Sequence, residues 1–120
     1  MEQRCDVLVV DDDIAVLDLV AELLMAEGCR VRTAVDGREA LDILARWRPQ
    51  VVPLDIMMPV MSGIDVLDCM RDDPELARIP VVVISASFHH LARPLPADAV
   101  LAKPFSIDHL LERVASLTGT

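Results

Sequence analysis

Polar side chains that could bind a cation or a phosphoryl group follow four apolar stretches of this sequence. The stretches are DVLVV (6–10), VVPL (51–54), IPVVVI (79–84) and DAVLA (98–102). The polar residues that come after them are Asp11, Asp12 and Asp13, then Asp55, Ser85 and Lys103. Carboxylates that lie close together repel one another and resist ionising unless a cation joins them. Their chemistry therefore depends on whether the folded chain brings them together.

These residue types are the ones that a phosphoryl-acceptor site requires. Mg²⁺ prefers oxygen ligands and is commonly held by one or two carboxylates together with phosphate oxygens. An aspartate can also act as a nucleophile and form an aspartyl-phosphate. Lys103 and Ser85 would supply the positive charge and the hydroxyl donor that phosphoryl oxygens need.

Each acid taken alone has a simpler explanation, because aspartates commonly cap helices and turns without any chemistry. The convergence of several acids with a hydroxyl and a lysine on one edge of a sheet is harder to obtain by accident. That convergence favours a functional site.

The elements that would position these residues alternate between strands and helices. Strands are predicted at 6–10, 30–35, 51–54, 79–85 and 98–102, and the polar alternation of 30–35 indicates an edge strand. Helices are predicted from the N-cap Asp13 to Gly28, from Asp36 to before Pro49 with Trp47 on its apolar side, from Gly63, and over 106–117.

This alternation predicts an α/β fold, a doubly wound five-stranded parallel sheet with helices on both faces. In such a sheet, ligands bind beyond the carboxyl ends of the strands, where the strand order reverses. Each polar residue named above leaves a strand at that edge. The sequence therefore predicts one shallow cleft that contains all of them.

Composition limits the possible partners. The chain has 120 residues, 53% of them hydrophobic and 2% aromatic, which is enough for one domain (1–120) with an aliphatic core. A net charge of −9 argues against nucleic acids and anionic membranes and suits a basic protein partner or a cation. The plainer alternative is that the charge keeps the domain soluble.

Three cysteines, Cys5, Cys29 and Cys69, are widely spaced and form no CxxC or Cys/His cluster. A structural zinc site is therefore not expected, and we interpret all three as small buried apolar residues. The N-terminus lacks a signal-peptide pattern and no apolar stretch is long enough to span a membrane, so we expect a cytoplasmic protein.

The motifs VLVVDDD, DGREALDIL, LDIMMPVMSG, VVVISA and AKPF occur in this order. Together they resemble the receiver domains of two-component response regulators, over essentially the whole chain. The resemblance implies the flavodoxin-like strand order 2-1-3-4-5. It also implies a signalling switch that is phosphorylated by a histidine kinase or a histidine phosphotransfer protein and acts on a downstream effector or output domain, rather than an independent enzyme.

The resemblance assigns a role to each matching residue. Asp55 corresponds to the phosphoacceptor, and Asp11 and Asp12 to the acidic pair that binds Mg²⁺ together with the backbone carbonyl of Met57. Ser85 and Lys103 correspond to the residues that contact the phosphoryl group. Ser87 is at a position that tunes phosphoryl lifetime, and the Lys103–Pro104 bond corresponds to a cis peptide.

Three features depart from the family pattern. Pro53 lies in a predicted central strand, so we expect its missing N–H to fall outside the ladder or at a bulge. Val100 replaces the aromatic residue that commonly acts as a rotamer switch. The 86–98 segment is short and contains Pro94 and Pro96, which predicts a shortened or missing fourth helix and makes segment 87–97 a candidate switch element.

Two other functions compete with this one. A receiver-like interaction module that is never phosphorylated would explain the altered switch region but not the complete acidic site. A phosphatase or dehalogenase with an aspartate nucleophile would need a second acid two residues after Asp55, where the chain has Met57, and a cap domain. We expect no output domain in this chain, which would be a stand-alone regulator or the N-terminal receiver of a longer protein.

Overall fold

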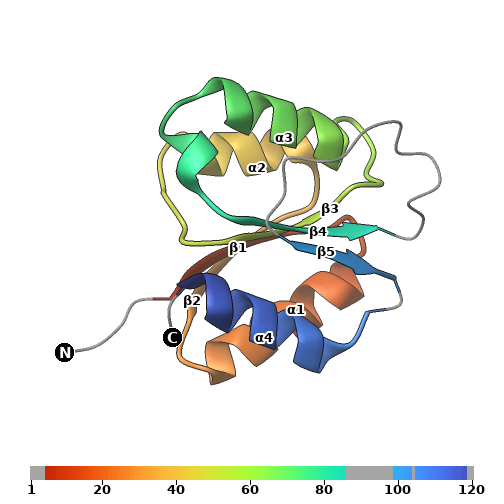
Figure 1. The fold of residues 1–120 in the computed structure, drawn as a ribbon. Helices are drawn as coiled ribbons and strands as arrows, with labels where there is room; N and C mark the ends of the chain where they lie inside the picture. The colour runs from red at the N-terminus through yellow and green to blue at the C-terminus, as the bar shows by residue number, and fades with distance from the viewer. Residues whose placement is uncertain (1–4, 86–98, 104, 119–120) are drawn as a thin grey trace.

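The sheet at the centre of the computed structural model has the strand order β2-β1-β3-β4-β5, with all neighbours parallel (Figure 1). The strands are β1 (Asp6–Val10), β2 (Arg30–Ala34), β3 (Val52–Asp55), β4 (Val81–Ser85) and β5 (Ala99–Ala102). The structure describes residues 5–85, 99–103 and 105–118. The predicted five-stranded sheet and its order are confirmed, and β2 lies at an edge as expected.

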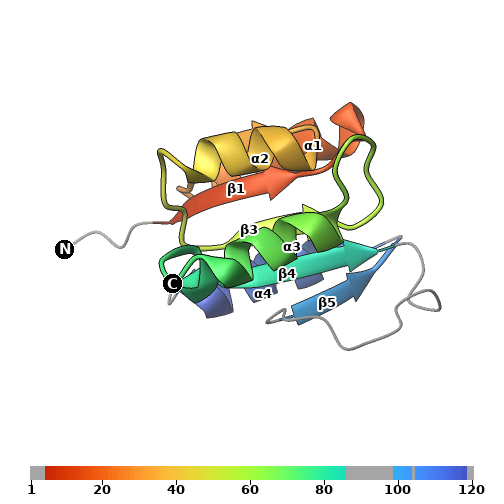
Figure 2. The ribbon, with the colours of Figure 1, turned by 90° about the horizontal axis from the view of Figure 1, so that it is seen from above.

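Helices cover both faces of this sheet (Figures 1 and 2). One face carries α1 (Ile14–Ala26) and α4 (Ile107–Thr118), and the other carries α2 (Gly37–Leu44), α3 (Gly63–Asp72) and the short 3-10 helix η1 (Leu76–Arg78). Within the described part of the chain, no helix is long and apolar enough to cross a membrane.

Alternate residues of β1 face opposite layers, which explains its unbroken apolar sequence. Val7 and Val9 pack in the cluster beneath α1 and α4, whereas Leu8 and Val10 pack in the cluster beneath α2 and α3. Successive side chains of a strand point to opposite faces of the sheet. A strand that is covered on both faces must therefore be apolar at every position.

The predicted helix boundaries are confirmed at several ends. The Asp13 side chain accepts hydrogen bonds from the backbone N–H groups of Ala15 and Val16 and so caps α1. Asp36 caps α2 in the same way through the N–H of Glu39. Gly28 follows α1 with φ 93°, a left-handed conformation that glycine adopts without strain.

The predicted second helix is shorter than expected. It ends at Leu44, so Trp47 lies beyond it and packs against the core from the following loop, with the Arg32 guanidinium 4.8 Å from its ring centroid. Trp47 continues the apolar spacing of the helix, and this spacing predicted a longer helix. A residue in the loop after the helix can contact the same face of the core, so the spacing does not distinguish the two.

Pro53 lies inside β3, as predicted, and its missing N–H falls on the side of β1, where the ladder is interrupted. The Val52 N–H donates to Pro80 O (3.0 Å), directly before β4, and the Ile56 N–H donates to Ile84 O (3.1 Å) within β4. Since successive backbone N–H groups alternate between the two neighbouring strands, the Pro53 nitrogen faces β1. The β1–β3 pairing is interrupted there, with pairs at Val7–Val51 and Val10–Leu54 only.

The cysteine prediction is correct for burial at two positions and wrong in other respects. Cys5 and Cys29 are buried, but they form a disulfide instead of packing as separate thiols. Cys69 is a free, exposed thiol on α3. The pairing was not foreseen because it depends on how β1 and β2 align, which spacing alone does not show.

Some predictions fall on residues outside the described ranges. They concern the fourth helix and the switch element within 86–98, Ser87, and the cis peptide before Pro104. The helix labelled α4 here is the one that follows β5 and corresponds to the helix predicted over 106–117.

Val60, in the loop after β3, has φ 68° and is 81% exposed. A β-branched side chain is strained in this left-handed region, and an exposed one gains little from packing. We expect Val60→Gly to raise the free energy of unfolding by about 1 kcal/mol in chemical denaturation. Val60→Ala is the control, because it retains a Cβ and should gain less. A Val60→Gly variant that is less stable than wild type would contradict this explanation.

Candidate functional site

The first part of the site is formed by the residues directly after β1. Asp11 is 2% exposed, whereas Asp12 is exposed and Asp13 is used as the α1 cap. The Asp11 Oδ1 atom accepts a hydrogen bond from the Asp13 backbone N–H at 2.9 Å. The turn between β1 and α1 therefore orients the buried carboxylate and leaves its second oxygen, Oδ2, available to the sheet edge.

Asp55 is the last residue of β3 and lies beside this turn. It is 2% exposed, and the pairing of Val10 with Leu54 places Asp11 and Asp55 at the ends of neighbouring strands. The Asp55 Oδ1 atom accepts a hydrogen bond from the backbone N–H of Met57 at 3.2 Å. The loop after β3 thus orients Asp55 in the same way as the loop after β1 orients Asp11.

Lys103 bridges these two carboxylates from the end of β5. Its Nζ atom lies 3.2 Å from Asp11 Oδ2 and 3.3 Å from Asp55 Oδ2. The lysine side chain is 25% exposed, so its stem is largely enclosed while one side stays open to solvent. One ammonium group therefore compensates two buried carboxylates, which leaves an excess of negative charge.

Ser85 ends β4 at the same edge and is fully buried. Its backbone oxygen accepts a hydrogen bond from the Lys103 N–H at 2.8 Å, and Ile84, the residue before it, is paired with Asp55. The residues predicted from the sequence to share a cleft are thus gathered at one edge, although they come from four different strand ends.

Burial and repulsion shape the ionisation of this cluster. Burial, followed by the negative charge of Asp11, raises the pKa of Asp55 to about 6, although Lys103 and the Met57 N–H act in the opposite direction. Burial lowers the pKa of Lys103, but the hydrogen bonds and charges of Asp11 and Asp55 outweigh it, and the net shift is upward. Lys103 stays protonated, whereas Asp55 ionises reluctantly.

The arrangement of oxygens fits a divalent cation. Asp11, Asp12 and Asp55 each offer a carboxylate oxygen within 4.8 Å of the others. Asp11 Oδ2 is buried and, among the described residues, has no polar partner apart from the Lys103 ammonium at 3.2 Å. An oxygen-only set of clustered carboxylates, one of them with a buried oxygen that a single ammonium contacts, is an environment that suits Mg²⁺.

Gly63 is a site residue whose role was missed in the sequence. A Cβ at this position would lie 2.8 Å from Ile56 Cα and would also clash with the Asp55 backbone oxygen, so α3 begins directly against the end of β3. The Gly63 N–H donates to Ile56 O at 2.9 Å. The signal was present as a glycine right after the N-cap Ser62, but only the tertiary contact shows what it approaches.

The raised pKa of Asp55 predicts how stability depends on pH in the metal-free domain. Between about pH 4 and 6, folded Asp55 holds its proton more tightly than unfolded Asp55 does, so its contribution to stability declines as the pH rises. We therefore expect Asp55→Asn to be more stable than wild type at pH 7, by about 2 kcal/mol, and the difference to vanish near pH 4.

The measurement is chemical denaturation of both proteins between about pH 4 and pH 7, with a metal chelator present. Asp12→Asn is the control, because it removes an exposed carboxylate from the same cluster and should change stability little. An Asp55→Asn variant that is less stable than wild type at pH 7 would show that Lys103 compensates the carboxylate fully.

Comparison with known proteins identifies relatives across nearly the whole chain. Residues 7–115 match the family model of the response regulator receiver domain. The chain is 39% identical to response regulator MprA of Mycolicibacterium vanbaalenii over 115 residues, which is 92% of this chain and 49% of MprA. It is 31% identical to the polar-differentiation response regulator DivK of Brucella anthropi, over 94% of this chain and 95% of DivK. The chain thus spans about half the length of MprA but nearly all of DivK.

Solved structures agree with this relationship. The chemotaxis response regulator CheY4 of Vibrio cholerae has a TM-score of 0.86 and 30% identity, with 95% of this chain and 98% of CheY4 covered. Response regulator TrrA of Thermotoga maritima, solved in complex with Mg²⁺ and BeF, has a TM-score of 0.83 and 32% identity, with 94% and 98% covered. By sequence and by fold, this chain belongs to the response regulator receiver domains of two-component signalling.

Proposed function

We propose that this receiver domain accepts a phosphoryl group on Asp55 from the phosphohistidine of a histidine kinase or a histidine phosphotransfer protein, in a reaction that requires Mg²⁺. The single observation that carries this proposal is the position of Asp55. Its carboxylate lies buried at the end of a strand, 3.3 Å from the Lys103 ammonium and next to two further acids.

Each residue of the site has a part in this transfer. A carboxylate oxygen of Asp55 attacks phosphorus, the P–N bond to the donor histidine breaks, and the imidazole leaves. Lys103 balances the charge on the phosphoryl oxygens, and the Ser85 hydroxyl donates a hydrogen bond to one of them. Asp55 keeps its orientation because the Met57 N–H holds Oδ1.

A magnesium ion would be held by Asp11, Asp12, Asp55 and the backbone carbonyl of Met57. When bound, it would neutralise negative charge shared between the carboxylates and the phosphoryl oxygens. The proposal is supported by the cluster geometry and by TrrA, a relative of similar fold whose structure is a complex with Mg²⁺ and BeF. The domain assists a reaction on itself and is not proposed to be an independent enzyme.

The phosphodonor must bring a histidine to a recessed carboxylate, so its docking surface must lie beside the site. A hollow of about 560 Å³ adjoins Lys103 and is lined mainly by apolar residues of α1 and of the segment after β5. Ile14 and Leu19 on α1 are 61% and 48% exposed. Apolar side chains of this kind suit a protein partner better than a small, charged phosphodonor.

The position in β5 that commonly carries a switching aromatic residue in receiver domains is a valine in this chain. Val100 in β5 is 47% exposed and is too short and too stiff at χ1 to act as a swinging aromatic lever. We therefore keep the prediction that another element conveys the phosphorylated state to a downstream effector or output domain, by a shift between two populated conformations.

Phosphorylation is tested by incubating the domain with Mg²⁺ and acetyl phosphate and measuring the intact mass. We expect wild type to gain one phosphoryl group and Asp55→Asn to gain none while keeping its circular dichroism spectrum. Asp18→Asn, at an exposed acid on α1, is the matched control and should be labelled like wild type. Equal labelling of Asp55→Asn would exclude Asp55, and an unlabelled wild type would favour an interaction module that is not phosphorylated.

Magnesium binding is tested separately through thermal unfolding. A ligand that binds only the folded state stabilises it by about 2.7 kcal/mol at ~100 times its Kd, which corresponds to a rise of several degrees in Tm. We expect that rise in wild type and in Asp18→Ala but a much smaller one in Asp12→Ala. The same shift in Asp12→Ala as in wild type would remove Asp12 from the metal site.

A further inference from the structure

Two cysteines meet at the end of the sheet opposite to Asp55. Cys5 directly precedes β1 and Cys29 directly precedes β2, and their sulfurs are bonded. The Cα–Cα distance is 4.6 Å, within the range that disulfides span without backbone movement. Cys5 precedes the residues 7–115 that match the family model, and neither cysteine belongs to the acidic site described above.

The sheet itself holds the two cysteines together. β1 and β2 are paired from Asp6–Arg30 onward, and Cys5 and Cys29 are the residues directly before this first pair. The Arg30 N–H donates to Cys5 O at 2.8 Å, and the Arg30 guanidinium binds the Asp6 carboxylate at 2.7 and 2.9 Å. The Cys29 N–H donates to Leu24 O at 3.1 Å. These contacts hold the backbone beside both cysteines and do not depend on the bond between the sulfurs.

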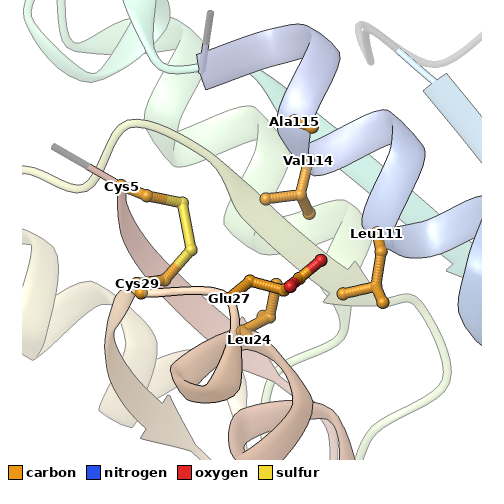
Figure 3. Close-up of a pocket in the computed structure, with 8 residues that line it drawn as sticks. Cys5, Leu24, Glu27, Cys29, Leu111, Val114 and Ala115 are labelled. Atoms are coloured by element: carbon orange, nitrogen blue, oxygen red, sulfur yellow. A yellow bond between two sulfur atoms is a disulfide. The ribbon is translucent and has the colours of Figure 1, made fainter. Parts of the chain in front are cut away.

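A cavity of about 280 Å³ opens beside the two cysteines (Figure 3). Leu111, Val114 and Ala115 of α4 line its opposite wall, and the Glu27 side chain extends from the end of α1 toward that wall. The volume is close to the lower limit of small-molecule sites in proteins. The disulfide is therefore buried from bulk solvent but lies on the wall of a space that admits a small thiol.

The fold does not depend on this bond for its core. Two clusters of buried aliphatic side chains fill both faces of the sheet, and a domain of 120 residues buries enough surface to fold without cross-links. Structural disulfides serve mainly small domains with insufficient cores. A bond that the core does not need, between residues that the backbone already aligns, can open while the domain stays folded.

We propose that Cys5 and Cys29 form a reversible redox site that exchanges with low-molecular-weight thiols and disulfides through this cavity. In the oxidising direction, one cysteine thiolate attacks a sulfur of the small disulfide and expels one thiolate. The second cysteine attacks the resulting mixed disulfide, forms the Cys5–Cys29 bond and expels the other thiolate. Two electrons pass from the protein to the small disulfide, and the two protons of the cysteines go to the released thiols.

The bond has a physical consequence for the domain. It closes a chain segment with a sequence separation of 24, which includes the whole of α1, the helix that begins beside the acidic site. Closing a loop of this length restricts the unfolded chain. We expect reduction to lower Tm by about 10 °C while the circular dichroism spectrum stays that of a folded domain.

The redox titration uses the Cys69→Ser variant, so that the exposed third thiol does not interfere. The folded protein is equilibrated in glutathione buffers from fully reduced to fully oxidised, free thiols are alkylated, and the mass is measured. We expect the pair to pass reversibly from two alkylated thiols to none within this range. Two alkylated thiols in the most oxidising buffer, or none in the most reducing one, would overturn the proposal.

The role of the cavity is tested by the rate of reduction. Ala115→Leu adds bulk to the wall opposite the sulfurs and should slow reduction by glutathione about tenfold, because access limits exchange at buried sulfurs. Ser116→Leu adds the same side chain at an exposed position of the same helix and should react like the parent. Equal rates for Ala115→Leu and the parent would exclude the cavity route. Asp55→Asn should titrate like the parent, so failure of this proposal is distinguishable from failure of the phosphorylation proposal.

Discussion

The ion pairs of Lys103 with Asp11 and Asp55 are the interaction on which the site depends. Two buried carboxylates share one ammonium at 3.2 and 3.3 Å, so the removal of Lys103 would leave both carboxylates buried without compensation, whereas the removal of Asp55 leaves Asp11 and Lys103 paired. Burial, followed by the negative charge of Asp11, raises the pKa of Asp55, so the single ammonium does not compensate both carboxylates fully. Any cation that enters the cluster therefore relieves repulsion, and this links the stability of the domain to the occupancy of its site.

The sheet brings these three residues together because its strands are parallel and the strand order reverses at β1. β2 extends the sheet on one side of β1, whereas β3, β4 and β5 follow on the other side. All carboxyl ends then lie at one edge, and loops of different length project from it. Pro53 shows how strong this constraint is, since β3 keeps its place between β1 and β4 even though one ladder donor toward β1 is missing.

β1 connects two kinds of chemistry at its opposite ends. Its amino end adjoins the Cys5–Cys29 disulfide and its carboxyl end adjoins Asp11, and the five residues between them span about 16 Å at ~3.3 Å per residue. The same parallel pairing aligns the cysteines at one end and the carboxylates at the other. The domain can therefore carry a second chemical input without a contact between the two sites.

The sequence by itself determined the parts of this protein that follow from local patterns. Continuous apolar runs predicted the strands, Asp13 and Asp36 predicted helix starts, and residue types at strand ends predicted that acids, a hydroxyl and a lysine gather at one edge of the sheet. Only the tertiary structure decided the Cys5–Cys29 pairing, the approach of Gly63 to Asp55, the strand that Pro53 faces and the raised pKa of Asp55. Each of these depends on distances between residues far apart in the chain, which strand register and burial set and which no local pattern encodes.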